Sequence, residues 1–316
     1  MNKLMLPMNL QLFADGAVLN YATAYQQGLQ RRYAENGLLY SQKLWNSPGN
    51  SLLKWSGTKE IKLPKLLIKN GRRDRVRRTI TTPSANYENQ WETYTLKNER
   101  YWDTLVDPSD IDETDYVTSI ANITKVYNDN EKIPEMDKQM FSSLFSLKQT
   151  HDGGKGIEAI GLTEDNILKQ FDKMMLAMDK AAVPSGRLLF VSPEVNYILK
   201  EAKGMQRTFS VQNNNGEINR IVRRLDEVTI ETAIPNDRFM TLYDFTVGAQ
   251  VAQGAKQIQM MLIHPTCMAA PQKYSFVGLD KPSASTAGNY LYYEQSYDDV
   301  LLFETKTDAL EIVTEA

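Results

Sequence analysis

The chain of 316 residues is 42% hydrophobic and 24% charged, which is typical of folded proteins and argues against intrinsic disorder. Its formal net charge of −3 excludes a protein whose whole surface binds polyanions. The single cysteine, Cys267, allows no disulfide within the chain, which fits a reducing compartment, and no apolar run reaches the roughly 18 residues of a membrane helix.

The first residues, MNKLMLPMNLQLFADG, combine a lysine with an apolar run, as a secretory signal does. A proline and two amide residues interrupt the run, and the large Leu12 stands where a cleavage site needs a small residue. We therefore expect residues 1–50 to form an N-terminal arm of the working protein. Because apolar side chains in water are costly, the arm is expected to contact a partner through Leu10, Leu12 and Phe13.

Residues 51–112 contain two extended runs separated by turn signals. Val76–Thr82 and Trp91–Leu96 are rich in the β-branched and aromatic residues that favour strands. Asn70-Gly71 and Pro83-Ser84 are typical of turns. The pattern predicts a long two-stranded flap with a mobile tip.

Charge is distributed unevenly over this flap. Residues 59–78 carry nine basic and two acidic side chains, whereas residues 99–115 carry seven acidic side chains and one basic. Blocks of opposite sign favour pairing between copies of the chain, where they select the partner more than they add affinity. The alternatives are contact of the arginines with nucleic acid and a merely solvated face. The residues expected at the contact are Arg72, Arg73, Arg75, Arg77, Arg78, Glu99, Asp103 and Asp107.

Residues 113–156 are predicted to form a long helix and its end. Apolar residues recur at helical spacing in two stripes, Tyr116, Ile120, Ile123 and Tyr127, then Met136, Met140, Phe141, Leu144 and Phe145. Pro134 lies between the stripes, so the helix either restarts there, with proline in its first turn, or kinks. The glycine-rich segment His151–Gly156 then ends the helix and is typical of a hinge or domain boundary.

Residues 157–262 alternate between helical and extended patterns. Thr163 is a good N-cap for a helix that buries Ile167, Phe171, Met174 and Met178. A short apolar strand, Arg187–Val191, precedes a second helix that starts at Ser192, and strands follow at 217–232 and 257–263. This succession predicts a layered α/β lobe. Further strand-like runs, Val300–Phe303 and Leu310–Val313, lie in the tail.

Catalytic motifs are not found in the sequence. There is no Gly-x-Gly-x-x-Gly after a strand and no Walker loop, and two histidines with one cysteine give no cluster at metal-binding spacing. His264 and Cys267 could form a nucleophile pair, but Pro265 intervenes and a buried structural role is commoner. The paired carboxylates Asp112-Glu113 and Asp298-Asp299 fit a solvated acidic face better than catalysis. We expect no catalytic residue, cofactor or metal.

Four stretches, taken in order, resemble the major capsid proteins of tailed bacteriophages, which have the Hong Kong 97-type fold. They are Met8–Ala14; Asp112–Asp115 followed by Ser119–Ile123 and Ile133–Asp137; Val183–Arg187 with Phe190–Pro193; and Gln259–Pro265 with Tyr290–Asp308. Each stretch alone is weak, and their order and spacing over most of residues 8–313 carry the resemblance.

The resemblance implies an α+β subunit with an N-terminal arm (1–50) and an extended β-hairpin loop with flanking strands (51–112). A peripheral domain would contain a long spine helix (113–156), and an axial α/β domain would span 157–262. Residues 263–316 would return to the peripheral domain. Some relatives cross-link through a lysine and an asparagine, but no such pair is matched here.

The resemblance also implies a structural protein that is not an enzyme. Its copies would self-assemble into the hexamers and pentamers of an icosahedral head enclosing double-stranded DNA, with the extended loop over the adjacent subunit. The expected partners are a separate scaffolding protein, because only a short arm precedes the flap, then a portal, the packaged DNA and in some cases a decoration protein, but no membrane. The protein would be located in the virion after assembly in the host bacterial cytoplasm.

Three alternatives remain open. An encapsulin-like nanocompartment shell would share the fold but enclose cargo enzymes. A nucleic-acid-binding protein would act through Arg72–Arg78. A hydrolase would use His264 and Cys267.

Overall fold

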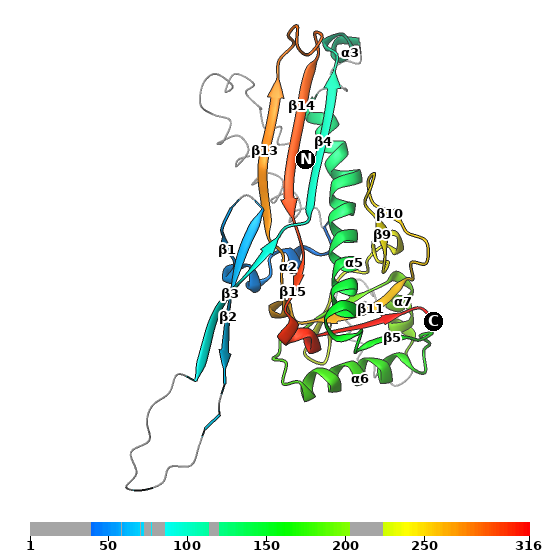
Figure 1. The fold of residues 1–316 in the computed structure, drawn as a ribbon. Helices are drawn as coiled ribbons and strands as arrows, with labels where there is room; N and C mark the ends of the chain where they lie inside the picture. Colours follow the sequence, from blue (N-terminus) through cyan, green and yellow to red (C-terminus); the bar gives the residue numbers. More distant parts are fainter. Residues whose placement is uncertain are drawn as a thin grey trace, which may run out of the picture.

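The computed structural model describes residues 39–57, 59–69, 71–72, 77, 86–113, 120–202 and 224–316. One long helix runs through the centre of the molecule (Figure 1). A three-stranded sheet lies along the upper part of this helix, a six-stranded sheet lies at its lower end, and a narrow flap projects away from both. The chain is thus an α+β protein, as expected.

The long helix consists of α4 (Ile120–Tyr127), a π-helical segment η3 (Asn128–Lys132) and α5 (Ile133–Asp152). The restart considered at Pro134 does not occur, because the backbone keeps helical dihedral angles at Lys132 and Ile133. The N–H of Ile133 donates to the carbonyl of Asn128, five residues back, so the helix widens just before the residue that lacks an N–H.

The long helix ends at Asp152, within the glycine-rich segment that was predicted to end it. Gly153 has a φ of 69° and donates its N–H to the carbonyl of Lys148, a left-handed cap that suits glycine. At the other end, residue 113 is the last residue of the short helix α3 (Pro108–Glu113), and the described part of the long helix begins at Ile120. Residues 114–119 lie outside the described residues.

The six-stranded sheet has the order β5-β16-β11-β6-β8-β7. Its strands are β5 (Ile157–Ala159), β16 (Leu310–Thr314), β11 (Ile258–Ile263), β6 (Leu188–Val191), β8 (Val228–Ile230) and β7 (Arg224–Leu225). β16 lies between β5, to which it is parallel, and β11, to which it is antiparallel. The expected boundary at residue 263 therefore does not coincide with a sheet boundary.

Helices cover both faces of this sheet. Phe190, Met261 and Ile312 face α5, while Val191, Met260 and Val313 face α6 (Ile167–Lys180) and α7 (Pro193–Glu201). This alternation is the two-residue period of strands buried on both sides, and it confirms the predicted layered lobe.

The starts of the two helices differ in how well the sequence predicted them. Ser192 accepts a hydrogen bond from the N–H of Val195 and caps α7 as expected. Thr163 does not cap α6, which begins four residues further on at Ile167. The side chain of Asn166 accepts the N–H of Thr163 at 2.7 Å and closes a turn ahead of the helix, so a nearby amide competes with the threonine.

The three-stranded sheet consists of β13 (Gln272–Asp280), β14 (Tyr290–Asp298) and β4 (Asn98–Val106), all antiparallel. It rests on the long helix through Trp102, whose ring stacks on Tyr127 with centroids 4.0 Å apart.

The flap consists of β2 (Glu60–Ile68) paired with β3 (Tyr87–Thr95), with β1 (Lys54–Trp55) beside β2 at the base. A two-stranded flap is present, and its second strand overlaps the predicted run 91–96, but its first strand is β2 and not the run 76–82. Apart from Arg77, the run 76–82 lies outside the described residues, so its structure stays a prediction. The remaining short elements are α2 (Gln42–Trp45), η2 (Pro48–Leu52), η4 (Asn236–Arg238), β9 (Tyr243–Asp244), β10 (Gln250–Val251), η5 (Pro265–Cys267), β12 (Met268–Ala269), β15 (Leu301–Leu302) and η6 (Glu304–Ala309).

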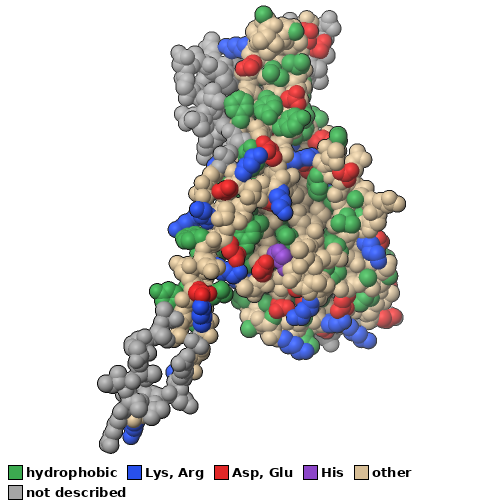
Figure 2. Space-filling view, viewed as in Figure 1, with side chains coloured by type: hydrophobic (Ala, Val, Ile, Leu, Met, Phe, Trp, Pro, Cys, Tyr) green, Lys and Arg blue, Asp and Glu red, His purple; other side chains and the backbone are tan. Residues whose placement is uncertain are grey.

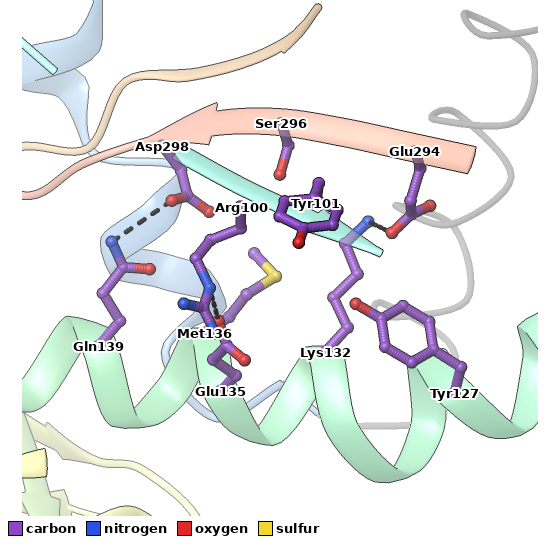
Figure 3. A pocket seen from close by; sticks show the side chains of 10 residues that line it. All are labelled: Arg100, Tyr101, Tyr127, Lys132, Glu135, Met136, Gln139, Glu294, Ser296 and Asp298. Atoms are coloured by element: carbon purple, nitrogen blue, oxygen red, sulfur yellow. Dashed lines mark hydrogen bonds and ion pairs between the residues drawn. The ribbon is translucent and has the colours of Figure 1, made fainter. Parts of the chain in front are cut away.

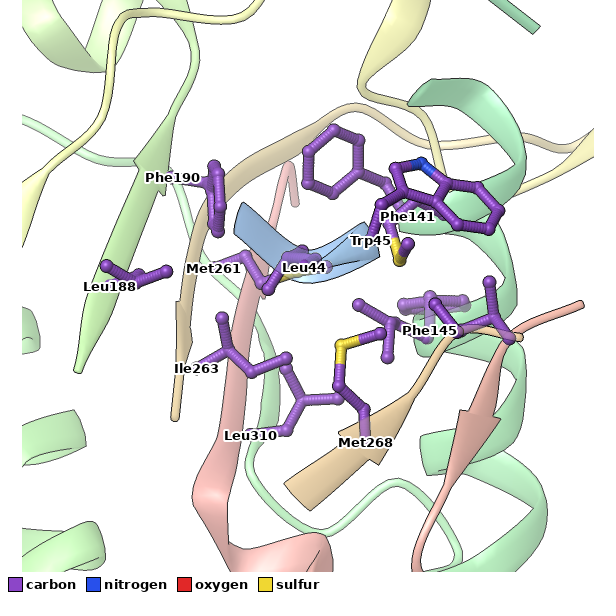
Figure 4. Close-up of a cluster of buried hydrophobic side chains, with 14 of the residues drawn as sticks. Leu44, Trp45, Phe141, Phe145, Leu188, Phe190, Met261, Ile263, Met268 and Leu310 are labelled. Carbon is purple, nitrogen blue, oxygen red and sulfur yellow. The ribbon is translucent and has the colours of Figure 1, made fainter. Parts of the chain in front are cut away.

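The main core lies between α5, the six-stranded sheet and the segment that contains α2 (Figure 4). Phe141 packs edge-on against Phe190 and Phe239, with ring centroids 5.4 and 4.8 Å away. Leu44 and Trp45 of α2 fill the space between α5 and β12 and are almost fully buried. The chain around α2 is thus part of the core, not of a detached arm.

Candidate interaction surfaces

The two faces of the flap carry different mixtures of apolar and polar side chains. β2 and β3 pair along their full length, from Glu60 opposite Thr95 to Ile68 opposite Tyr87. Since side chains alternate along a strand, one face collects five apolar residues. These residues, which we call the apolar flap face, are Pro64, Leu66, Ile68, Tyr87 and Trp91.

The apolar flap face is exposed to solvent. Ile68 is 75% exposed, Leu66 and Tyr87 are 63% exposed, and Trp91 is 46% exposed with the Lys54 ammonium 4.7 Å from its ring centroid. A two-stranded ribbon cannot form a core by itself, so these side chains are buried only if another surface covers them.

The opposite face of the flap combines charged and polar side chains with the apolar residues Leu63, Leu67 and Tyr94. Lys65 forms an ion pair with Glu92, and Lys69 forms one with Glu88. Both pairs are diagonal, since the residue directly opposite Lys65 is Gln90 and the residue directly opposite Glu88 is Leu67. Exposed pairs of this kind contribute at most about 1 kcal/mol each. The charged side chains of this face thus have partners within the flap, whereas Leu67 on the same face is 41% exposed.

The base of the flap is anchored to the three-stranded sheet. Ile61 is fully buried against Leu96 and Tyr297. Beside them, Lys59 forms an ion pair with Glu99, which also accepts the hydroxyl of Tyr297 at 2.6 Å. These hydrogen bonds, that of Lys59 foremost, hold the pKa of Glu99 below its usual range. The anchor fixes the direction in which the flap leaves the body.

Aromatic side chains gather on the outer face of the three-stranded sheet, visible in the upper part of Figure 2. The rings of Tyr101 and Tyr293 stack with centroids 6.0 Å apart, and Phe276 lies 6.0 Å beyond Tyr293. The ring of Phe276 lies so close over Gly278 that a Cβ there would be 2.7 Å from it. With Leu105, which is 59% exposed, these three rings form what we call the aromatic sheet face.

The first acidic residues of the segment 99–115 lie on the three-stranded sheet and not on the flap, where they were expected. Glu99 and Asp103 are exposed on β4, and Asp107 follows that strand and accepts the N–H of Ser109 at 2.8 Å. β4 pairs with β14 over nine residues and belongs to the three-stranded sheet, so the prediction that both charge blocks share the flap is wrong. The acidic residues instead border the aromatic sheet face.

The other predicted contact residues are only partly within the described residues. Arg72 and Arg77 are exposed near the flap tip. Arg73, Arg75, Arg78, Leu10, Leu12 and Phe13 lie outside the described residues. The role of all these residues in a contact stays a prediction.

A polar pocket lies between β4, β14 and the long helix (Figure 3). Arg100 donates through Nε to Glu135 at 2.7 Å. Lys132 forms an ion pair with Glu294 at 2.9 Å, and the side chains of Lys132 and Glu294 are both nearly buried. The guanidinium of Arg100 also donates to the carbonyls of Phe245 and Gly248. The charged side chains in the pocket thus connect the three-stranded sheet to the long helix and to the β9–β10 hairpin.

Asp298 lines the same pocket and is not the solvated acid that the sequence suggested. The side-chain amides of Asn98 and Gln139 donate to its Oδ1. Burial raises its pKa to about 6. Its neighbour Asp299 accepts the N–H groups of Lys97 and Val300, both at 2.9 Å. The two carboxylates therefore face different partners and do not form an acid–base pair.

His264 and Cys267 do not form a nucleophile pair. The imidazole Nδ1 of His264 lies 2.7 Å from Thr266 Oγ1, and its Nε2 lies 3.1 Å from the carbonyl of Ser185. Cys267 is fully buried, and burial raises the pKa of its thiol to about 12. The favoured structural interpretation of both residues is confirmed.

The buried thiol gives a direct prediction. A thiol reagent at pH 8 is expected to modify Cys267 in the native chain at least about a hundredfold more slowly than in guanidinium, because reaction requires local or global opening. The time course of absorbance after mixing measures this ratio. Equal rates in the two conditions would show that the thiol is accessible in the folded protein.

Sequence reasoning missed both exposed apolar faces. In β2 the run Leu63–Ile68 is apolar at every position except Lys65, so the sequence did not assign Pro64, Leu66 and Ile68 to one face. A short apolar run of this kind is ordinarily assigned to a buried strand.

Two features are absent from the part of the chain that the structure describes. No group of three or more histidine, cysteine or acidic side chains is placed to hold a metal ion. None of the described helices is both long and apolar enough to span a membrane.

Comparisons with known proteins give matches only at the level of structure. No protein-family profile and no curated relative matches the sequence. The mature capsid of bacteriophage PhiM1 matches with a TM-score of 0.58 and 14% identity, covering 82% of each chain. A structure from Mycobacterium phage Che8 matches with a TM-score of 0.54 and 15% identity, covering 87% of this chain and 90% of that chain.

A third match is the capsid of the cyanophage P-SCSP1u, with a TM-score of 0.51 and 10% identity over 83% of this chain and 85% of that chain. At sequence identities this low, the matches show a shared fold and nothing about function. The chain has the Hong Kong 97-type fold of these capsid structures, as the order of the sequence motifs implied.

Proposed function

We propose that this chain is the major capsid protein of a tailed bacteriophage, a structural subunit without enzymatic activity. Its copies assemble into the hexamers and pentamers of an icosahedral head that encloses double-stranded DNA. The observation that carries the proposal is the apolar flap face, which is exposed in the single chain and requires a partner. The capsid fold supports the choice of further copies of the same chain as that partner.

In the proposed shell, the flap of one copy lies over the aromatic sheet face of its neighbour. Two nine-residue strands give the flap a reach of about 30 Å, enough to cross an adjacent subunit. Lys54 and Lys62 flank the apolar flap face, while Glu99 and Asp103 border the aromatic sheet face. Apolar burial would supply most of the affinity, and these charges would select the register.

Such a contact is heterologous, because the two surfaces differ, and heterologous contacts generate closed rings when the rotation between copies closes. A stable interface buries more than about 1,000 Å² in total, which a protruding flap reaches more easily than a compact body does. A scaffolding protein and a portal would act during assembly in the bacterial cytoplasm. The mature protein would be located in the virion, with DNA on its inner surface and in some cases a decoration protein outside.

The proposal is tested by producing the chain in bacteria, alone and together with its neighbouring genes. Light scattering after size exclusion gives the particle mass, and cryo-electron microscopy gives the symmetry. Uniform shells of megadalton mass with hexamers and pentamers, and nuclease-protected double-stranded DNA in particles from infected cells, are expected.

Each other outcome points to a different function. Shells filled with a protein cargo and no DNA would identify a nanocompartment instead. Binding of DNA by the unassembled chain that weakens steeply with salt, without any shell in either preparation, would favour a nucleic-acid-binding protein. Monomers alone in both preparations would overturn the proposal.

A further inference from the structure

The glycine-rich junction between α5 and β5 has no role in the contacts described so far. Gly153, Gly154 and Gly156 all have positive φ angles, of 69°, 79° and 84°. Three left-handed glycines within four residues let the chain reverse from the helix into the six-stranded sheet. The junction is the point at which the long helix is joined covalently to that sheet.

The carboxylate of Glu311 is lodged against this junction. A Cβ at Gly156 would lie 2.5 and 2.6 Å from its two oxygens, so any side chain at position 156 would displace the carboxylate. The neighbouring Ile312 donates its N–H to the carbonyl of Gly156 at 3.0 Å, which fixes β16 beside the junction. Glu311 is only 9% exposed in this position.

The nearby cations already have other partners. The fully buried Lys148 of α5 donates to the carbonyl of Thr307 at 2.8 Å and pairs with Asp152 at 2.9 Å. Lys155, within the junction, pairs with Asp308 of η6 at 2.9 Å.

The sheet side of the junction adds another acid. Glu158 of β5 pairs with Lys173 of α6 at 2.5 Å and accepts a hydrogen bond from Gln170. Glu311 therefore faces two cations, Lys148 and Lys155, and two acids, Glu158 and Asp308. Burial first, and then the two acids, raise its pKa to about 7 against the opposing effect of the two cations.

We infer that the junction is a proton-sensitive hinge in which Glu311 carries a proton when α5 and β5 close on it, and in which ionisation of Glu311 loosens the joint. The inference concerns a single copy of the chain and does not rest on the proposed shell. The uncharged carboxyl fits the confined space against Gly156. The carboxylate would need solvent or a donor, and both are reached by opening the glycine junction.

The direction of the pH effect follows from the binding of protons. A carboxyl whose pKa is higher in the folded chain binds more protons there than in the unfolded chain. Its contribution to stability is therefore complete below about pH 4.5 and is lost as the pH rises to about 7. Near neutral pH, small changes in acidity would shift the hinge between its closed and loosened forms.

The experiment compares the full-length chain with Glu311→Gln, which keeps the shape of the carboxyl but cannot ionise. The matched control is Glu304→Gln, an exposed acid in the neighbouring η6. Thermal unfolding midpoints are recorded between pH 5 and pH 8. The wild type and the control are expected to lose several degrees more than Glu311→Gln over this range, and the variant is expected to be the most stable of the three at pH 8.

Hydrogen exchange supplies a second readout that needs only the wild type. Protection factors, corrected for the intrinsic pH dependence of exchange, are compared at pH 6 and pH 8. A loss of protection confined to peptides covering 153–159 and 308–314 supports the hinge. Equal pH dependence of the wild type and Glu311→Gln overturns it, as does unchanged protection in these peptides should the variant fail to fold.

Discussion

Aspartate in place of Ile68 is expected to abolish assembly at concentrations where the wild type forms shells. Ile68 of the apolar flap face is 75% exposed, and burying an isoleucine contributes about 1.5–3 kcal/mol. The replacement loses this contribution and places a charge in a surface that must leave water, which adds a desolvation cost. Because every copy repeats the contact, the penalty accumulates over the shell. Light scattering and electron microscopy of the purified variant measure the outcome.

Gln90→Asp is the matched control for this experiment. It introduces the same charge on the opposite face of the flap, where Gln90 lies opposite Lys65, three residue pairs nearer the base than Ile68. It is expected to assemble as the wild type does. Circular dichroism of both unassembled variants should be unchanged, since neither side chain is part of a core. Normal shells from Ile68→Asp would show that the apolar flap face is not a subunit contact.

Alanine in place of Asp137 is expected to destabilise the chain by about 3–5 kcal/mol. Asp137 is fully buried on α5. It accepts the N–H and hydroxyl of Ser41 at 2.9 and 2.7 Å, the N–H of Tyr40 at 3.3 Å, and Arg238 at 3.3 Å. Removing the carboxylate leaves two backbone donors, a hydroxyl and a guanidinium without their partner, and this loss is a large part of a typical stability of 5–15 kcal/mol.

Guanidinium unfolding of the unassembled chain measures this effect. Asp137→Asn should be intermediate, because its carbonyl still accepts from Ser41 while the charge that faces Arg238 is gone. Asp172→Ala, on the exposed side of α6, serves as the control and should change stability by less than about 0.5 kcal/mol. A loss below 1 kcal/mol for Asp137→Ala would mean that the segment around Ser41 is not held by this carboxylate.

The helices and strands with a clear apolar period were predictable from the sequence. The stripe from Met136 to Phe145 and the residues Ile167, Phe171, Met174 and Met178 are buried as expected. The strands β6, β11 and β16 also lie where apolar runs placed them. In each case the information is local, because the spacing of apolar residues in one element decides which side faces the core.

The predictions that failed concern contacts between residues far apart in the sequence, or local segments in which two hydrogen-bonding patterns compete. Asp137 and Ser41 are 96 positions apart, so a charged residue within a helical stripe gave no sign of its buried partner. The pairing of β4 with β14, which separates the acidic residues from the flap, joins residues 184 to 200 positions apart in the sequence. The π-helical segment before Pro134 and the turn closed by Asn166 depend on small differences between alternative hydrogen bonds.

The position of β16 also affects when the protein can fold. The six-stranded sheet has this strand between β5 and β11, so those two strands have no common partner until residues 310–314 have left the ribosome. At about 5–20 residues per second, synthesis of the segment from Ile263 to Leu310 takes roughly 2–10 s. During this interval the lobe is open and cannot present its finished surface to another copy. Synthesis itself would therefore delay association until each subunit has folded.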